Sequence, residues 1–255
     1  MSARISIKAL LVATLIAIVP WSSHATTWAS SKVRDPITGQ RVTVQEPASS
    51  GSYVYSWPEK SDQVFWPYTD SQWLWFNPDS GFIAFGNDFE KLDSTQRDAL
   101  KTWLKANYDR KAPPKSRLEL LSWAEKVYAV RGMDEDFWST FYRLMAFETQ
   151  DDTKTSLGYV RKALPLLEKS LSTSTDAGKT LRELYLLSEY NRRLGRDDEA
   201  KRYLDRLTST EVNEDLSGFK KYLLEISEAQ RTGVSGKSSH SGQGKGGSLP
   251  ERGES

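Results

Sequence analysis

The spacing of hydrophobic and polar positions changes near residue 92 and divides the chain into two kinds of structure. Before that point, short β-prone runs at 41–44, 53–55 and 73–76 are separated by prolines and glycines. After it, apolar residues recur at helical spacing. We therefore expect a β-rich module over 26–92 packed on a helical region over 93–231, which is an α+β fold that is mainly α.

The helical pattern predicts a series of helices after residue 92. Asp93 followed by Gln96 is typical of a helix cap, so the first helix is expected over 95–108. Pro165 is expected to interrupt or kink the helix that contains it, because an interior proline removes a backbone hydrogen bond. The remaining helices are expected over 116–131, 134–149, 155–171, 177–194, 197–208 and 215–230.

Two pairs of these helices share one layout. A glycine, Gly132 or Gly195, follows the first helix of each pair, and an aspartate, Asp134 or Asp197, can cap the second. Each pair therefore predicts an antiparallel helical hairpin, and the layout resembles tetratricopeptide repeats. The first helix of the first pair, 116–131, carries two apolar faces, so we expect it to pack between its own hairpin and the β-rich module.

The predicted helix over 177–194 carries a row of polar side chains opposite its leucines. We interpret this row as a candidate partner-binding face, while a solvated helix face with no partner is the alternative. The residues of this face are Arg182, Tyr185, Glu189 and Arg192.

The first 25 residues have the pattern of a signal peptide. Arg4 and Lys8 come before an uncharged apolar run over 9–19, and small residues up to Ala25 offer a cleavage site. The run is shorter than the about 20 residues that a membrane-spanning helix needs. We therefore expect cleavage after Ala25 and a periplasmic protein without a membrane span, with an uncleaved anchor as the alternative. The Gly/Ser-rich tail over 232–255 is expected to be disordered.

Composition excludes several kinds of site. The chain has no cysteine, and its two histidines, His24 and His240, lie in the predicted signal peptide and tail. The expected folded region therefore lacks the thiol and imidazole groups of Ser-His and Cys-His enzymes and of the usual zinc sites. Net charge is +1 with no basic block, which argues against a nucleic-acid partner. We expect a protein without cofactors that is not an enzyme.

Two strings in the β-rich module share one pattern of a polar residue, proline, any residue, a polar residue and glycine. Cysteines at the polar positions would make each string a zinc knuckle, and two knuckles make a four-cysteine zinc ribbon. The strings are Asp35-Pro36-Ile37-Thr38-Gly39 and Asn77-Pro78-Asp79-Ser80-Gly81.

The chain resembles a bacterial family of unknown function whose members carry two such cysteine knuckles, the second after a Trp-rich strand, and end in tetratricopeptide-like helices. The resemblance covers about residues 33–208, and it implies a zinc-ribbon-like module but no activity. The residues that match are 35–39, 73–85, Asp88-Phe89, Tyr128, Arg131-Gly132 and Leu194-Gly195.

None of the four positions that correspond to metal ligands, Asp35, Thr38, Asn77 and Ser80, is a thiol. These oxygen and amide groups suit zinc poorly, so we expect no metal. Hydrogen bonds from Asp35 and Asn77 to turn amides, together with packing of the many aromatic residues in 53–89, are expected to replace it.

Three functions fit these observations. The first is a non-catalytic interaction or scaffold protein that holds an unidentified periplasmic or envelope protein. The second is a carbohydrate- or peptidoglycan-binding module that uses the aromatic-rich stretch 53–76, although rings in so small a module also serve as its core. The third is a carboxylate-based hydrolase. Its candidate acids are Glu59, Asp62, Asp70 and Asp79.

Overall fold

The computed structural model describes residues 27–49 and 61–232 and divides them into two compact units. The mixed unit contains residues 27–49 and Pro67–Gly132, and the helical unit contains residues 61–66 and 133–232. The fold is α+β and mainly α, as predicted. The expected signal peptide, the 53–55 strand and nearly all of the expected tail lie outside the described residues.

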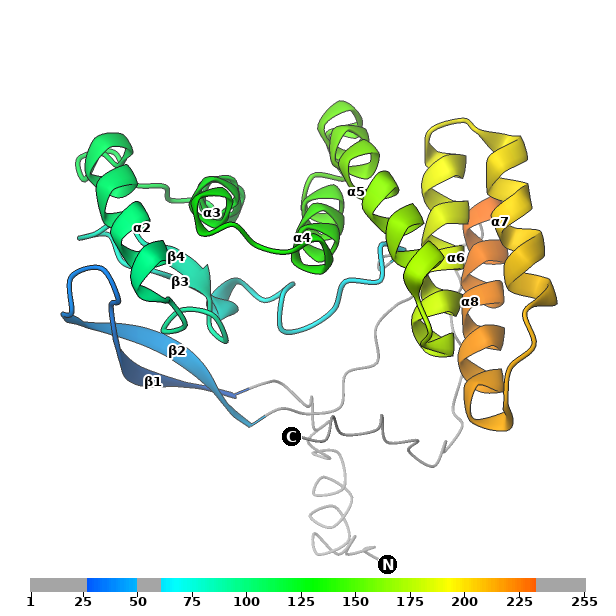
Figure 1. Cartoon of the computed structure of the whole chain (residues 1–255), viewed down its shortest axis with the longest axis horizontal. Coiled ribbons are helices and arrows are strands. Elements are labelled where there is room, and N and C mark those ends of the chain that lie inside the picture. Colours follow the sequence, from blue (N-terminus) through cyan, green and yellow to red (C-terminus); the bar gives the residue numbers. More distant parts are fainter. Residues whose placement is uncertain (1–26, 50–60, 233–255) are drawn as a thin grey trace, which may run out of the picture. The chain divides into compact units, whose positions relative to one another are not determined.

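All the predicted helices are confirmed to within a few residues at each end (Figure 1). The mixed unit contains β1 (Thr27–Arg34), β2 (Arg41–Ser49), β3 (Leu74–Phe76), β4 (Ile83–Phe85), α2 (Ser94–Asn107) and α3 (Arg117–Arg131). The helical unit contains α4 (Glu135–Glu148), α5 (Thr153–Thr173), α6 (Ala177–Arg193), α7 (Asp197–Ser209) and α8 (Glu214–Thr232). α5 continues through Pro165, so the expected interruption is wrong. Its buried apolar face continues past the proline to Leu167, and this packing holds the helix together.

The two Pro-Gly motifs form the turns of two antiparallel hairpins. β1 pairs with β2 from Thr27↔Ser49 to Arg34↔Arg41, and β3 pairs with β4 from Leu74↔Phe85 to Phe76↔Ile83. The turns have the same geometry, since the N–H of Gly39 donates to the Asp35 carbonyl and that of Gly81 to the Asn77 carbonyl, both at 2.8 Å. Both glycines have left-handed backbones, with φ of 74° and 77°.

The two turns meet at the carboxylate of Asp35, which is fully buried. Oδ1 of Asp35 accepts hydrogen bonds from the backbone N–H groups of Ile37 (2.6 Å) and Thr38 (2.9 Å). Oδ2 accepts from the side-chain amide of Asn77 and from Oγ of Ser80 (2.6 Å) in the other turn. The four positions that correspond to metal ligands therefore lie together. Oδ1 of Asn77 also accepts from the Asp79 N–H at 2.9 Å, so the predicted hydrogen bonds of Asp35 and Asn77 with turn amides are confirmed.

Aromatic side chains hold the second turn against the helices. The hydroxyl of Tyr108 donates to the Pro78 carbonyl at 2.7 Å, and Nε1 of Trp123 donates to the Gly81 carbonyl at 2.7 Å. The Tyr108 and Trp123 rings are themselves in contact, with centroids 5.7 Å apart. Aromatic packing thus supports the turn at its backbone carbonyls as well as through ring contacts.

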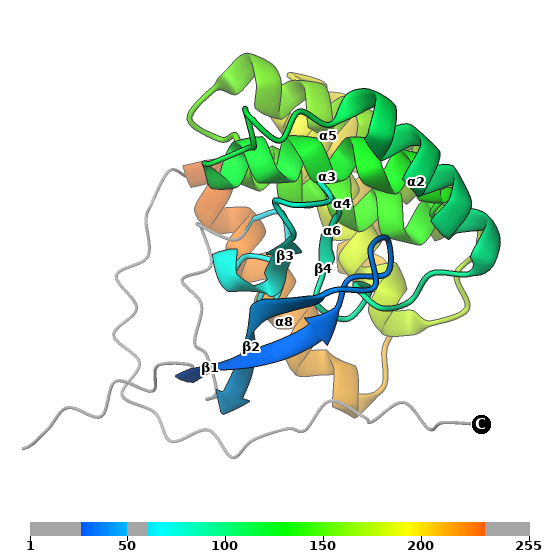
Figure 2. The same ribbon diagram turned by 90° about the vertical axis from the view of Figure 1, so that its left-hand side faces the viewer.

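α3 packs on β4 through Tyr128, which has no exposed surface. Its hydroxyl accepts from the Phe85 N–H at 2.8 Å and donates to Oδ2 of Asp88 at 3.2 Å. Burial raises the pKa of Tyr128 well above its ordinary value, so the phenol stays neutral and able to donate at neutral pH. The expected packing of this helix on the β-rich module is confirmed, and Figure 2 shows β3 and β4 between the β1–β2 hairpin and the helices α2 and α3.

The second predicted helical hairpin is confirmed within the helical unit. α6 and α7 pack on each other across a turn at Gly195, and Oγ of Ser188 donates to the Ala200 carbonyl at 2.8 Å. Asp197 does not cap α7, because Arg196 takes the cap position and Asp197 is already inside the first turn. The helices of the first predicted hairpin, α3 and α4, belong to different units, which divide at Gly132.

The two turn glycines allow a matched comparison. Gly39→Ala should destabilise the fold by about 1–2 kcal/mol, the usual cost of a left-handed backbone for an L-residue. Gly81→Ala should destabilise it by more, because its Cβ would also lie 2.3 Å from Cγ of Tyr108, whereas the nearest atom to a Cβ at Gly39 is 3.9 Å away. Urea unfolding followed by tryptophan fluorescence measures both losses, and equal losses would contradict the role of Tyr108.

Candidate functional site

The polar face predicted on α6 is partly buried. Tyr185 has no exposed surface and Glu189 is 4% exposed, whereas Arg182 and Arg192 are half-buried. The expectation that these four side chains form one solvent-facing row is therefore wrong for Tyr185 and Glu189. Glu189 tolerates burial because Arg192 donates to both of its carboxylate oxygens, from Nε at 2.9 Å and from an Nη at 2.6 Å.

The burial of α6 has a simple cause, since it is the central helix of its unit. α5, α7 and α8 all pack on it (Figure 1). A fourth neighbour is a short stretch of chain over residues 61–66, which we call the inserted segment. A helix with neighbours on all sides must bury polar as well as apolar residues, and the buried polar residues then need partners.

The inserted segment is held by side chains from two helices. Asp62 and Val64 are both 3% exposed. Oδ1 of Asp62 accepts from Nη1 of Arg193 on α6 at 2.8 Å, and Nε2 of Gln63 donates to the hydroxyl of Tyr222 on α8 at 3.4 Å. The sequence interpretation missed this contact, although an arginine in the apolar run of α4, Arg143, signalled that a buried carboxylate was needed.

Burial and the neighbouring groups shift the pKa of Asp62 in opposite directions within the helical unit. Burial raises the pKa of the Asp62 carboxyl, and Arg193, the Tyr190 hydroxyl and Arg143 offset part of that rise. Burial lowers the pKa of the Arg143 guanidinium and raises that of Tyr190 well above its ordinary value. The cluster thus combines the desolvation of a charged group with nearby groups that favour its ionised form.

A cleft of about 560 Å³ lies among α6, α7 and α8, and it contains two residues of the predicted face. We call it the α6–α8 cleft. The Glu189–Arg192 pair lies in it, and exposed side chains of both signs, including Asp198 and Lys201, surround it. The residues that line it are Ser188, Glu189, Arg192, Asp197, Asp198, Ala200, Lys201, Leu204, Asp205, Ser227 and Arg231.

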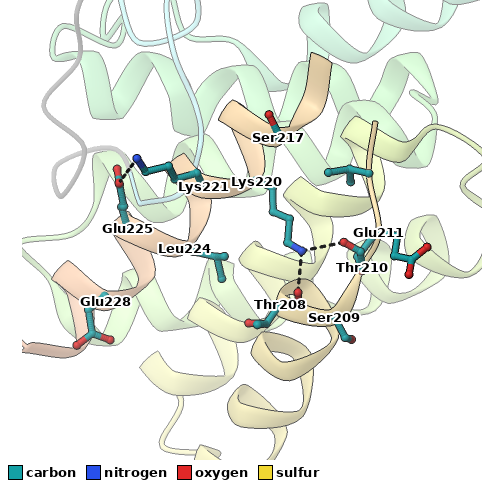
Figure 3. Close-up of a pocket in the computed structure, with 11 residues that line it drawn as sticks. Thr208, Ser209, Thr210, Glu211, Ser217, Lys220, Lys221, Leu224, Glu225 and Glu228 are labelled. Atoms are coloured by element: carbon teal, nitrogen blue, oxygen red, sulfur yellow. Dashed lines mark hydrogen bonds and ion pairs between the residues drawn. The ribbon is translucent and has the colours of Figure 1, made fainter. Parts of the chain in front are cut away.

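A second, more open groove runs between α8 and the connection from α7 to α8. Figure 3 shows Lys220 reaching across it to the end of α7, where Nζ donates to the carbonyls of Thr208 (2.7 Å) and Thr210 (2.8 Å). Lys221 on its rim pairs with Glu225 at 3.8 Å. Because Lys220 is engaged in closing the end of a helix, we assign this groove a structural role.

The three described carboxylates of the hydrolase interpretation have separate structural partners. Asp62 pairs with Arg193 in the helical unit. In the mixed unit, Asp70 caps the short turn Ser71–Trp73, and Asp79 pairs with Arg110 at 2.5 Å on the surface. Glu59 lies outside the described residues. No two of the three described acids are partners in any contact that would suit acid–base catalysis.

The aromatic rings of the carbohydrate interpretation are covered over their described part. No ring in 61–76 is exposed, and Trp75, at 6% exposure, donates from Nε1 to the Gln45 carbonyl at 3.0 Å. The rings over 53–60 lie outside the described residues. Trp75 therefore serves as packing, while the other described rings are half-buried.

Comparison of the chain with protein-family models, with curated proteins and with solved structures finds no match in any of the three. Within 27–49 and 61–232, no three histidine, cysteine, aspartate or glutamate side chains gather into a group that could hold a metal ion. Over the same residues, no helix combines the length and the apolar character that crossing a membrane requires. The α6–α8 cleft is the candidate site among the described residues, because three helices line it and it contains an ion pair.

The pH dependence of stability tests the cluster around Asp62. The pKa of Asp62 is raised in the folded state, so the protonated carboxyl stabilises the fold. This stabilisation is complete below the pKa of the unfolded state, about 4, and is lost as pH rises through the pKa of the folded state. The stability of the wild type relative to Asp62→Asn should therefore fall as pH rises from about 4 to 7. Urea unfolding midpoints of both proteins at several pH values measure this difference in stability. A difference that grows with pH in favour of the wild type would show that pairing with Arg193 outweighs the effect of burial.

Proposed function

We propose that this chain is an exported, non-catalytic interaction protein of the bacterial envelope, whose helical unit holds a segment of a partner protein in the α6–α8 cleft. The mixed unit would serve as a degenerate zinc-ribbon-like brace, as the family resemblance implies. The α6–α8 cleft carries this proposal, because three helices enclose it and its central ion pair is already in place. The signal-peptide pattern of residues 1–25 supports the location.

The chemistry of the cleft favours binding over catalysis. Glu189 is occupied by Arg192, so it is not available as a general base. Ala200 and Leu204 offer an apolar surface, while Asp198 and Lys201 present opposite charges around it. A peptide segment with an apolar side chain between charged residues fits this pattern, because charges around an apolar centre set the register of a partner.

A photo-crosslinking amino acid at position 201 tests the proposal in intact cells of the source bacterium. The Lys201 side chain is 73% exposed and lines the cleft, so this position should give a discrete adduct with an envelope protein. Adding Arg192→Ala should abolish the adduct, because Glu189 would then be buried without its cation and the cleft would lose its ordered charge pair.

Position 221 provides the matched control. The Lys221 side chain is 78% exposed on α8 but lines the open groove of Figure 3 instead of the cleft, so a crosslinker there should not give the same adduct. Circular dichroism checks that each variant is folded. Identical adducts from both positions, or none from position 201 in a folded and exported chain, would overturn the proposal.

A further inference from the structure

The inserted segment shows that the helical unit can hold an irregular stretch of chain. Residues 61–66 belong to no helix or strand, yet Asp62, Gln63 and Val64 are all buried. The segment comes from far away in the sequence, since its hydrogen bonds to Arg193 and Tyr222 span 131 and 159 positions. It thus occupies its surface much as a bound peptide would.

Different side chains of the segment are recognised by different helices. The carboxylate of Asp62 is bound by Arg193 on α6, and the amide of Gln63 reaches Tyr222 on α8. Val64 is buried next to them in sequence. Recognition of successive side chains by separate groups of the protein is how surfaces select peptide segments.

The backbone of the segment is held in an unusual conformation. Gln63 has φ of 54°, which places a non-glycine residue in the left-handed region. Such a backbone persists only where the surrounding contacts outweigh the strain. Contacts with the helical unit therefore determine the shape of the segment, as they would for a ligand.

We infer that the surface formed by α6 and α8 is a peptide-binding site that the inserted segment occupies in cis. The ligand class is a short peptide that turns at its carboxylate and carries a β-branched apolar residue two positions later and aromatic residues after it, as in Asp62 to Trp66. The residues that bind the segment differ from those that line the α6–α8 cleft, so this inference goes beyond the proposed function and does not rest on it.

The test empties the site and then offers a ligand in trans. Residues 61–66 of the full chain are replaced by a Gly/Ser sequence of equal length, and the probe is a fluorescent synthetic peptide with the sequence of residues 59–68. The emptied variant should bind the peptide saturably in fluorescence anisotropy. The wild type should bind it at least about 10-fold more weakly, because the tethered segment competes at a high effective concentration.

Peptide variants test the readout. Asp62→Ala or Val64→Asp in the peptide should weaken binding at least about 10-fold, whereas Ser61→Ala, the matched control, removes only a half-buried hydroxyl and should leave it unchanged. Lys201→Ala in the emptied chain, a change at an exposed residue of the cleft on α7, should also leave binding unchanged, which separates this site from the cleft. Equal binding of the Val64→Asp peptide would overturn the inference.

Val64→Ala in the otherwise intact chain is the second variant, for use if the emptied chain does not fold. This change loosens the segment without removing it, so the variant should bind the peptide more tightly than the wild type does. No binding by any folded variant would overturn the inference. A wild-type dimer that the Gly/Ser variant loses would overturn it as well, because the site would then hold a segment of a second copy.

Discussion

The carboxylate of Asp35 is the point on which the mixed unit depends. It is fully buried and accepts hydrogen bonds from two amides of its own turn and from two side chains, Asn77 and Ser80, of the other turn. Burying a charge is unfavourable unless donors surround it, and here four donors do. A single carboxylate therefore joins two Pro-Gly bends in the way that a metal joins two knuckles. The bends in turn position the strands on which Tyr128 and Trp123 hold α3.

The sequence predicts the features that have local causes. The helices, their Gly132 and Gly195 ends and the caps Asp93 and Asp134 follow from short patterns, and the likeness of the two bends predicts that they meet. The burial of Tyr185 and Glu189 has a distant cause, since α6 is covered by α8 and by a segment more than a hundred positions away. Reading a polar row as exposed assumes a helix with one free side, and α6 has none.

The distribution of charged groups separates structure from function in this chain. Asp62, Asp70 and Asp79 each make a particular structural contact, so these three of the acids that suggested hydrolysis are engaged in the fold. Two surfaces of the helical unit are the sites that we propose for protein segments. One is the α6–α8 cleft, and the other is the surface that already holds residues 61–66. Both involve α6, the central helix of the unit.

The most direct test of this account is the stability of Asp35→Ala compared with Asp79→Ala, measured by urea unfolding of the full chain. Asp79 is the matched control, because it is an aspartate in one of the same two turns with an exposed ion pair. We predict a loss of about 3 kcal/mol for Asp35→Ala, which leaves buried donors without an acceptor. We predict less than about 1 kcal/mol for Asp79→Ala. Equal, small losses for both would contradict the claim that the Asp35 carboxylate joins the two bends.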